Sequence, residues 1–153
     1  MQQIEIADIK DAQEILAPQK LAYQSEAAIY NNYAIPPLTQ SLEEMRADFE
    51  KQVVLKAVAD GKIIGSVRGY LQDGICFIGR VIVHPEFQNR GLGSQLMAAI
   101  ENCFTPVRWY ELFTGEKSER NLHFYHKLGY RIFRVERLKD AVPMVYLKKQ
   151  LPC

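Results

Sequence analysis

The clearest hydrophobic pattern in the chain lies at residues 77–104 and predicts a strand, a turn and a helix in succession. Residues 77–83 are apolar or β-branched at nearly every position and show no helical period, which is typical of a strand covered on both faces. From Gly93 onward, apolar side chains recur with the spacing of a helix packed on a sheet, until Thr105 and Pro106 end the pattern. These side chains are Leu92, Leu96, Met97, Ile100 and Phe104.

Further strands are predicted on both sides of this unit. Apolar or alternating runs occur at 2–7, 53–59, 62–70, 109–114, 130–138 and 142–147. Asp60-Gly61 between two such runs is a strong hairpin signal, and Gln72-Asp73-Gly74 marks a second turn. Strands two to four should therefore form an antiparallel meander. The helix that follows strand four should make strands four and five parallel neighbours.

Three other helices are predicted from their start and stop signals. The first begins near Asp8 or Asp11, and Pro18 predicts that it kinks or restarts there. Ser41, followed three residues later by Glu44, forms a capping box that predicts the start of the second. The last opens after Ser118 and ends at a glycine. Its apolar face consists of Leu122, Tyr125 and Leu128.

Composition and charge narrow the class of protein. A chain of 153 residues with 48% hydrophobic content is large enough for one domain with a real core, which we place at 1–153. A net charge of +1 gives no electrostatic reason to expect a nucleic acid or an anionic membrane as partner. No apolar run approaches the about 18 residues that span a bilayer, so we expect a cytoplasmic protein. Cys76, Cys103 and Cys153 have no metal-ligand spacing, so we expect reduced thiols and no metal.

The connector between the predicted strand and helix has the character of an anion site. Gly91 and Gly93 let the backbone approach a ligand where the first-turn N–H groups of a helix have no partner within the helix. Arg90 adds a full positive charge beside the helix N-terminus. No residue from 87 to 100 is acidic, although acidic residues normally favour a first turn. The pattern indicates an external phosphate, but short glycine motifs also occur in turns that bind nothing.

Two blocks of sequence resemble the GCN5-related N-acetyltransferase (GNAT) family. The first, 81–93, reads VIVHPEFQNRGLG and is similar to the family's Q/R-x-x-G-x-G/A motif after a strand ending in V-x-P. The second, 118–130, reads SERNLHFYHKLGY and is similar to the later helix that commonly ends F-Y-x-K-x-G-F/Y. The resemblance implies a single α/β domain with about seven mostly antiparallel strands, helices on both faces, and a splayed parallel pair at strands four and five.

This resemblance also implies where coenzyme A would bind. The pantetheine arm would bond to the backbone of Val81, Ile82 and Val83 in the gap between strands four and five. Asn121 would provide a polar contact from the last helix. Many family members instead carry Asn where Ser118 stands and Ala where Asn121 stands, so this contact is the least secure part of the comparison. The pyrophosphate would lie on the turn formed by Gln88, Asn89, Arg90, Gly91, Leu92, Gly93 and Ser94.

The implied chemistry requires a base for the amine and an acid for the departing thiolate. Tyr125 occupies the position of the tyrosine that serves as the acid in many family members, although a core tyrosine is the simpler structural interpretation. For the base, Glu111 in the fifth strand, Glu26 from the acceptor side and a chain of waters all stay open. We give Glu111 as the expected catalytic carboxylate, together with Tyr125.

The acceptor side is predicted from a polar, aromatic segment at 23–33, followed by Pro36-Pro37 as a stiff extended connector. Family members place their most variable specificity segment here, although a helix end and surface loop would look the same. Arg80, inside an apolar strand, must find a partner, which could be the acceptor's carboxylate or Glu111. The expected acceptor-binding residues are Tyr23, Glu26, Tyr30, Tyr33 and Arg80.

Together these patterns indicate an acetyl-CoA-dependent N-acetyltransferase that works by direct transfer to an amine in a ternary complex. The acceptor would be a small molecule or a peptide, and a homodimer stays open. The main alternative is a non-catalytic acyl-CoA sensor on the same fold. A phosphate-loop nucleotide hydrolase is disfavoured, because Gly93 is followed by Ser94 and Gln95 where that motif requires Lys and Ser or Thr.

Overall fold

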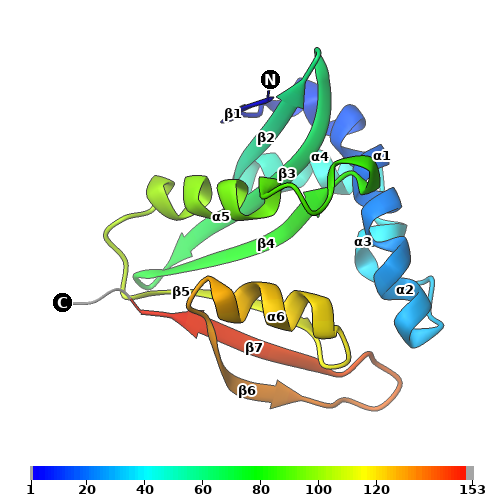
Figure 1. The fold of residues 1–153 in the computed structure, drawn as a ribbon, viewed down its shortest axis with the longest axis vertical. Helices are drawn as coiled ribbons and strands as arrows, with labels where there is room; N and C mark the ends of the chain where they lie inside the picture. The colour runs from blue at the N-terminus through cyan, green and yellow to red at the C-terminus, as the bar shows by residue number, and fades with distance from the viewer. Residues whose placement is uncertain (1, 151–153) are drawn as a thin grey trace.

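The computed structural model describes residues 2–150 and contains a seven-stranded mixed sheet with helices on both faces (Figure 1). The strand order is β1-β2-β3-β4-β5-β7-β6, and only the β4–β5 pair is parallel. This confirms the expected fold class. The strands are β1 (Gln2–Ile6), β2 (Val53–Ala59), β3 (Lys62–Gln72), β4 (Ile75–Val83), β5 (Trp109–Gly115), β6 (Arg131–Glu136) and β7 (Met144–Lys149).

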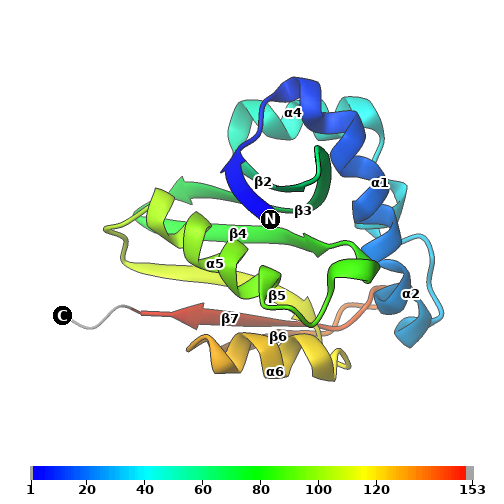
Figure 2. The same ribbon diagram turned by 45° about the horizontal axis from the view of Figure 1, so that its top comes forward.

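The helices divide between the two faces of the sheet (Figure 2). In β2, Leu55 belongs to the larger core under α5 and α6, while its neighbour Val54 belongs to a second core under α1 and α4. Such alternation is what a strand buried on both faces requires. The helices are α1 (Ala12–Ala22), α2 (Gln24–Tyr30), α3 (Pro36–Thr39), α4 (Leu42–Lys51), α5 (Leu92–Cys103) and α6 (Glu119–Lys127), with short 3₁₀ turns η1 (Ile9–Asp11) and η2 (Pro85–Phe87).

Both predicted Asp-Gly turns are confirmed, and they set the register of the β2–β3–β4 meander. Asp60 and Gly61 have φ angles of 51° and 77°, and Asp73 and Gly74 have φ angles of 53° and 79°. Positive φ at both central positions is the geometry of the tight hairpin turns whose twist matches the flanking strands. Residues 62–72 then pair with β2 on one side and β4 on the other.

A bulge in β4 reverses which side chains face which core. Ser66 pairs with Ile82, and Arg68 pairs with Gly79. Arg80 and Val81 on β4 therefore lie opposite the single residue Val67 on β3, which makes a β-bulge. Arg80 has a φ of 50°, in the left-handed region. Before the bulge, Ile78 faces the α5 core, whereas after it Ile82, of the same parity, faces the α1–α4 core.

The parallel pair β4–β5 separates along its length. Backbone pairing links Ile75 to Phe77 with Trp109 to Glu111, and the ladder goes no further. The carboxyl-terminal half of β4 and the end of β5 therefore stand apart. This splayed arrangement is the one expected for strands four and five.

Two expectations for the first forty residues are corrected: a helix restart at Pro18, which was the alternative to a kink there, and an extended connector at Pro36-Pro37. The first helix does not restart at Pro18, because the buried side chains of Ile15, Pro18 and Gln19 hold α1 together through the proline, and the break comes at Tyr23. Pro36-Pro37 does not form an extended connector but opens α3. Proline suits a first helical turn, where its missing N–H would have had no partner within the helix.

Two of the three cysteines lie in the described part of the chain, Cys76 buried and Cys103 exposed, and both are free thiols. Burial raises the pKa of the Cys76 thiol to about 12, which makes it unreactive. Cys153 lies outside the described residues. Within residues 2–150, no helix has the length and apolarity to cross a bilayer, and no three His, Cys, Asp or Glu side chains are grouped to hold a metal ion.

Candidate active site

A cleft of about 1000 Å³ follows the gap between β4 and β5. Its lining comes from α2, from the turn before α5, from β3, β4 and β5, and from α6. Segments that are far apart in the sequence therefore meet around one cavity. This volume is in the upper range for a small-molecule site.

The turn before α5 keeps its backbone donors free. Gly91 is the N-cap of α5 with a φ of 81°, it offers no side-chain cap, and the first helical turn has no acidic residue. A Cβ added at Gly91 would meet no atom within 4 Å, so the space beside this backbone is open. Gln88 Nε2 donates to Val83 O at 3.0 Å and holds the start of the turn against the end of β4. Open space and free N–H groups at a helix start suit an anion.

The residues predicted on this turn do not all reach the cleft. Arg90 is exposed, lies outside the lining and has its guanidinium carbon 5.5 Å from the centre of the Phe87 ring. Gly93 lines the cleft but also has a packing role, since a Cβ there would come within 3.1 Å of Phe124 Cζ on α6. The lining residues of the turn are Gln88, Asn89, Gly91, Leu92, Gly93 and Ser94.

In β4, Val81 and Val83 line the cleft, whereas the side chain of Ile82 is fully buried on the opposite face. This alternation agrees with a strand whose side chains pack while its backbone faces the gap. The prediction that the backbone of all three residues binds a ligand stays a prediction.

Tyr125 lies on the inner face of α6 and lines the cleft while being only 8% exposed. Its ring packs between Phe124 and Tyr130, with centroid distances of 5.1 and 6.0 Å. Burial raises the pKa of the Tyr125 phenol far above its usual value, and Tyr23 and the charge of Glu26 raise it further. The hydroxyl is therefore a proton donor that keeps its proton at all ordinary pH values.

Glu26 joins α2 to α6 across the end of β5. Its Oε1 accepts hydrogen bonds from Ser118 Oγ and from Asn121 Nδ2, both at 2.6 Å. Asn121 Nδ2 also donates to Thr114 Oγ1 on β5 at 3.2 Å. The sequence placed Glu26 and Asn121 in one site but gave no signal that they bond to each other.

Glu111 also lines the cleft, on the strand face opposite α5 and α6. Its Oε1 accepts from Trp109 Nε1 at 3.1 Å. The structure thus brings both candidate bases into one cavity, with Glu26 bonded to the N-cap and to a residue of α6 and Glu111 bonded to a neighbour on its own strand.

The three predicted tyrosines of the acceptor segment have different positions. Tyr23 lines the cleft beside Arg80, and burial raises the pKa of its phenol while the Arg80 guanidinium opposes that shift. Tyr30 lines the cleft, packs directly on Gly115, and accepts a hydrogen bond from the Lys117 N–H at 2.7 Å. Tyr33 is 55% exposed and lies outside the lining.

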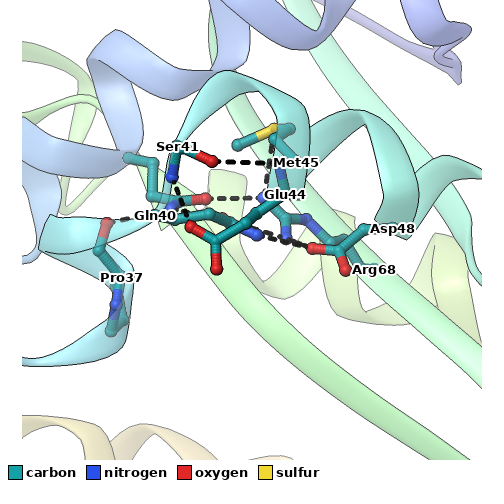
Figure 3. Close-up of polar contacts among 8 residues, drawn as sticks. Pro37, Gln40, Ser41, Glu44, Met45, Asp48 and Arg68 are labelled. Atoms are coloured by element: carbon teal, nitrogen blue, oxygen red, sulfur yellow. Dashed lines mark hydrogen bonds and ion pairs between the residues drawn. The ribbon is translucent and has the colours of Figure 1, made fainter.

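Figure 3 shows a polar group that sequence patterns did not single out, centred on Arg68. Arg68 on β3 is buried, and Asp48 on α4 and Gln40 contact it. All three line the cleft. The one available signal was an arginine within the long β3 run, since a buried charge needs a partner.

Comparisons with known proteins agree with this geometry. The sequence model of the acetyltransferase (GNAT) family matches residues 11–130. The UPF0157 protein YqkA of Bacillus subtilis (strain 168) is 27% identical over 130 residues, which is 85% of this chain but 37% of that protein. This chain therefore spans well under half the length of that relative.

Solved structures show the same fold. The PaiA N-acetyltransferase from Thermoplasma acidophilum, in complex with coenzyme A, superposes with a TM-score of 0.81 at 16% identity over 99% of both chains. The ribosomal-protein-S18-alanine N-acetyltransferase from Escherichia coli superposes with a TM-score of 0.80 at 15% identity, over 98% of this chain and 94% of that one. The family match covers most of the chain, including the glycine turn and Tyr125. Fold, cleft and sequence match lead to one conclusion: the chain belongs to the GNAT family of acetyltransferases.

Proposed function

We propose that this protein is an acetyl-CoA-dependent N-acetyltransferase that acetylates a primary amine by direct attack in a ternary complex. The observation that carries the proposal is the cleft itself. It brings the acid-free start of α5, the end of β4 and the protonated phenol of Tyr125 into one cavity. A fold that only packed its core would have no need to keep these groups together around open space.

The residues present fit acetyl-CoA. Open space beside Gly91 and the uncapped first turn of α5 suit the pyrophosphate, which amides of 88–94 would hold. Where β4 leaves β5, the backbone of Val81 to Val83 would hold the pantetheine arm as an added strand. When bound, acetyl-CoA supplies an activated thioester that an amine can attack.

Tyr125 and Glu26 would then divide the proton transfers between them. The raised pKa of the Tyr125 phenol keeps a proton ready at Oη for the departing sulfur. A carboxylate must receive the proton of the amine, directly or through water. We assign this role to Glu26 because it lies near enough to Tyr125 for its charge to raise the pKa of the phenol; both carboxylates accept hydrogen bonds, Glu26 from Ser118 and Asn121 and Glu111 from Trp109.

The experiment that tests the proposal is thiol release from acetyl-CoA by the purified protein in the presence of pooled primary amines. Amine-dependent release that is lost in Tyr125→Phe would support an acetyltransferase. Tight acetyl-CoA binding by calorimetry without release from any pool would instead favour the non-catalytic sensor, and failure to bind acetyl-CoA would overturn both.

A further inference from the structure

Two arginines, Arg68 and Arg80, line the cleft, and only Arg68 pairs with a carboxylate in the described part of the chain. Arg68 is 1% exposed, its Nη1 lies 2.7 Å from Asp48 Oδ2, and its Nη2 lies 2.6 Å from Gln19 Oε1 (Figure 3). Gln40 and Met45 contact the same guanidinium. Asp48 thus compensates the positive charge of Arg68, so its negative charge does not also neutralise a neighbouring cation.

Arg80 has no such partner. It forms none of the ion pairs found within residues 2–150, and its Nε is buried without a hydrogen-bond acceptor there. The Nε of Arg68 also lacks an acceptor, so the missing carboxylate is what distinguishes Arg80. A buried donor left unsatisfied is energetically costly, because it has lost its hydrogen bonds to water. Burial lowers the pKa of Arg68 to about 10, and the nearby positive charge of Arg80 acts in the same direction although Asp48 opposes it. The positive charges of Arg68 and Arg80 therefore act unfavourably on each other.

The other carboxylates of the cleft are already engaged. Glu26 accepts from Ser118 and Asn121, and Glu111 accepts from Trp109. Neither forms an ion pair with Arg80 in the described part of the chain. The pairing of Arg80 with Glu111 that the sequence left open is therefore not formed.

The backbone holds Arg80 in place at a cost. Its φ of 50° lies in the left-handed region, which is strained for a residue other than glycine. The bulge that creates this angle brings Arg80 beside the hydroxyl of Tyr23. A strained, charged residue with an unpaired donor in a cleft is typical of a binding site.

We propose that Arg80 binds an anionic group of the acceptor, so that the amine acetylated by this protein carries a carboxylate or a phosphate-type anion. The inference rests on the proposed function and names its substrate class. The anion would compensate the positive charge of Arg80, which Asp48 does not neutralise. The Tyr23 hydroxyl would add a hydrogen-bond donor beside the anion. The amine would approach Glu26 and Tyr125, which lie in the same cavity.

Matched amines test the inference without any mutation. Each anionic amine is compared with its uncharged counterpart, for example 4-aminobutyrate with 4-aminobutanamide, and 3-aminopropylphosphonate distinguishes a phosphate-type anion from a carboxylate. The methylene spacer keeps the amine pKa values close, so a difference reports on the anion. Any amine found in the pooled screen is treated in the same way. We expect kcat/KM at least about tenfold higher for the anionic member, which corresponds to about 1.4 kcal/mol.

Variants assign the preference to Arg80. Arg80→Gln should abolish the preference mainly through a higher KM for the amine, with the KM for acetyl-CoA nearly unchanged. Arg80→Lys keeps the positive charge and should keep part of the preference for the anionic amine. Arg134→Gln is the matched control, because Arg134 also lines the cleft but pairs with Glu136 and stacks on Tyr146. It should keep the full preference, and acetyl-CoA affinity confirms that each variant is folded.

The outcomes separate this inference from the proposed function. Equal turnover of anionic and uncharged amines by the wild type overturns the inference and leaves the acetyltransferase standing. If no amine is turned over, calorimetry with the same pairs in the presence of coenzyme A decides. Anion-dependent binding that Arg80→Gln removes supports the inference, and its absence overturns it.

Discussion

Oε1 of Glu26 lies 2.6 Å from Nδ2 of Asn121, and this hydrogen bond joins helix α2 to helix α6. The second hydrogen of that amide nitrogen points to Thr114 Oγ1 at 3.2 Å. An asparagine has two amide hydrogens, so both are used within the protein. A contact between Asn121 and a cofactor would therefore use its carbonyl oxygen, and Asn121 couples the two halves of the site.

The two candidate bases can be separated by the same charge-removing change at each. Glu26→Gln should lower kcat/KM for the amine by about 10- to 100-fold, because general base catalysis is typically worth at least this much. Glu111→Gln should cost less than about threefold, and both should leave acetyl-CoA affinity unchanged. Steady-state kinetics at saturating acetyl-CoA make the comparison. A larger loss at Glu111 would reassign the base.

Tyr125→Phe removes the phenolic donor and keeps the ring that packs against Phe124 and Tyr130. We expect turnover to fall about 10- to 1000-fold, within the usual range for a general acid that water partly replaces. Thermal stability and acetyl-CoA affinity should change little.

The pH dependence provides a second test of Tyr125. Burial raises the pKa of the Tyr125 phenol, so its neutral, donating form persists above the ordinary value of 10. Ionisation of Tyr125 should therefore not lower the rate below pH 10. Any alkaline decline of the wild-type rate below pH 10 should persist in Tyr125→Phe. A decline that disappears in Tyr125→Phe would contradict the raised pKa, and wild-type turnover in the variant when chemistry limits the rate would make Tyr125 a core residue only.

Ser94→Asp tests the anion site by moving stability and affinity in opposite directions. An acidic residue in the first turn of α5 should stabilise the helix by about 0.3–1 kcal/mol, since Ser94 is exposed and this turn has no acid. The same charge should lower acetyl-CoA affinity at least about tenfold. Gly93→Asp would be a poorer test, because its side chain would meet Phe124.

The matched control is Gln95→Glu, which adds a negative charge one residue further, where the side chain accepts from Gln2 outside the cleft lining. Thermal melts and calorimetry on both variants give the two readouts. Equal losses of affinity at the two positions would show only a general repulsion, and no loss at Ser94 would place the phosphates elsewhere.

Asp48→Asn should lower the free energy of unfolding by about 2–3 kcal/mol. Removing one partner of a buried ion pair typically costs about 3–5 kcal/mol, but the Asp48 side chain is 26% exposed, so water compensates part of the loss. Glu50→Gln on the exposed side of α4 is the control and should stay within about 0.5 kcal/mol. Urea unfolding measures both, and equal stabilities would mean that Arg68 does not depend on Asp48.

Local signals in the sequence were sufficient for most of the fold. The β2 bounds and both Asp-Gly turns follow from residues that are adjacent in the chain. The capping box is also local: Ser41 Oγ accepts from the Glu44 N–H at 3.1 Å, and Glu44 Oε1 accepts from the Ser41 N–H at 2.9 Å. Pro18 was misjudged because the packing that holds α1 together comes from residues distant in sequence, which outweigh one lost hydrogen bond.

The site was predictable only where it is made of motifs. The glycine turn and Tyr125 have local patterns, so they could be placed in advance. The bond between Glu26 and Asn121 joins residues separated by 95 positions, and the partners of Arg68 come from two helices and a loop. The left-handed position of the bulge is Arg80 and not a glycine, so the neighbouring Gly79 within the strand pattern was a weak signal for it. Only the assembled sheet shows that Arg80 lacks a carboxylate.

The separation of β4 from β5 beyond Phe77 gives this sheet an edge in its interior. Outer edge strands commonly avoid sticking to other chains by carrying charges, as β6 does with Arg131 and Arg134. The interior edge at 81–83 is uncharged and apolar, so it is a template for any extended peptide. A ligand bound along this interior edge would block its pairing with another copy of the chain. Amide hydrogens in this stretch should then exchange more slowly, and concentrated samples should aggregate less, with acetyl-CoA than without it.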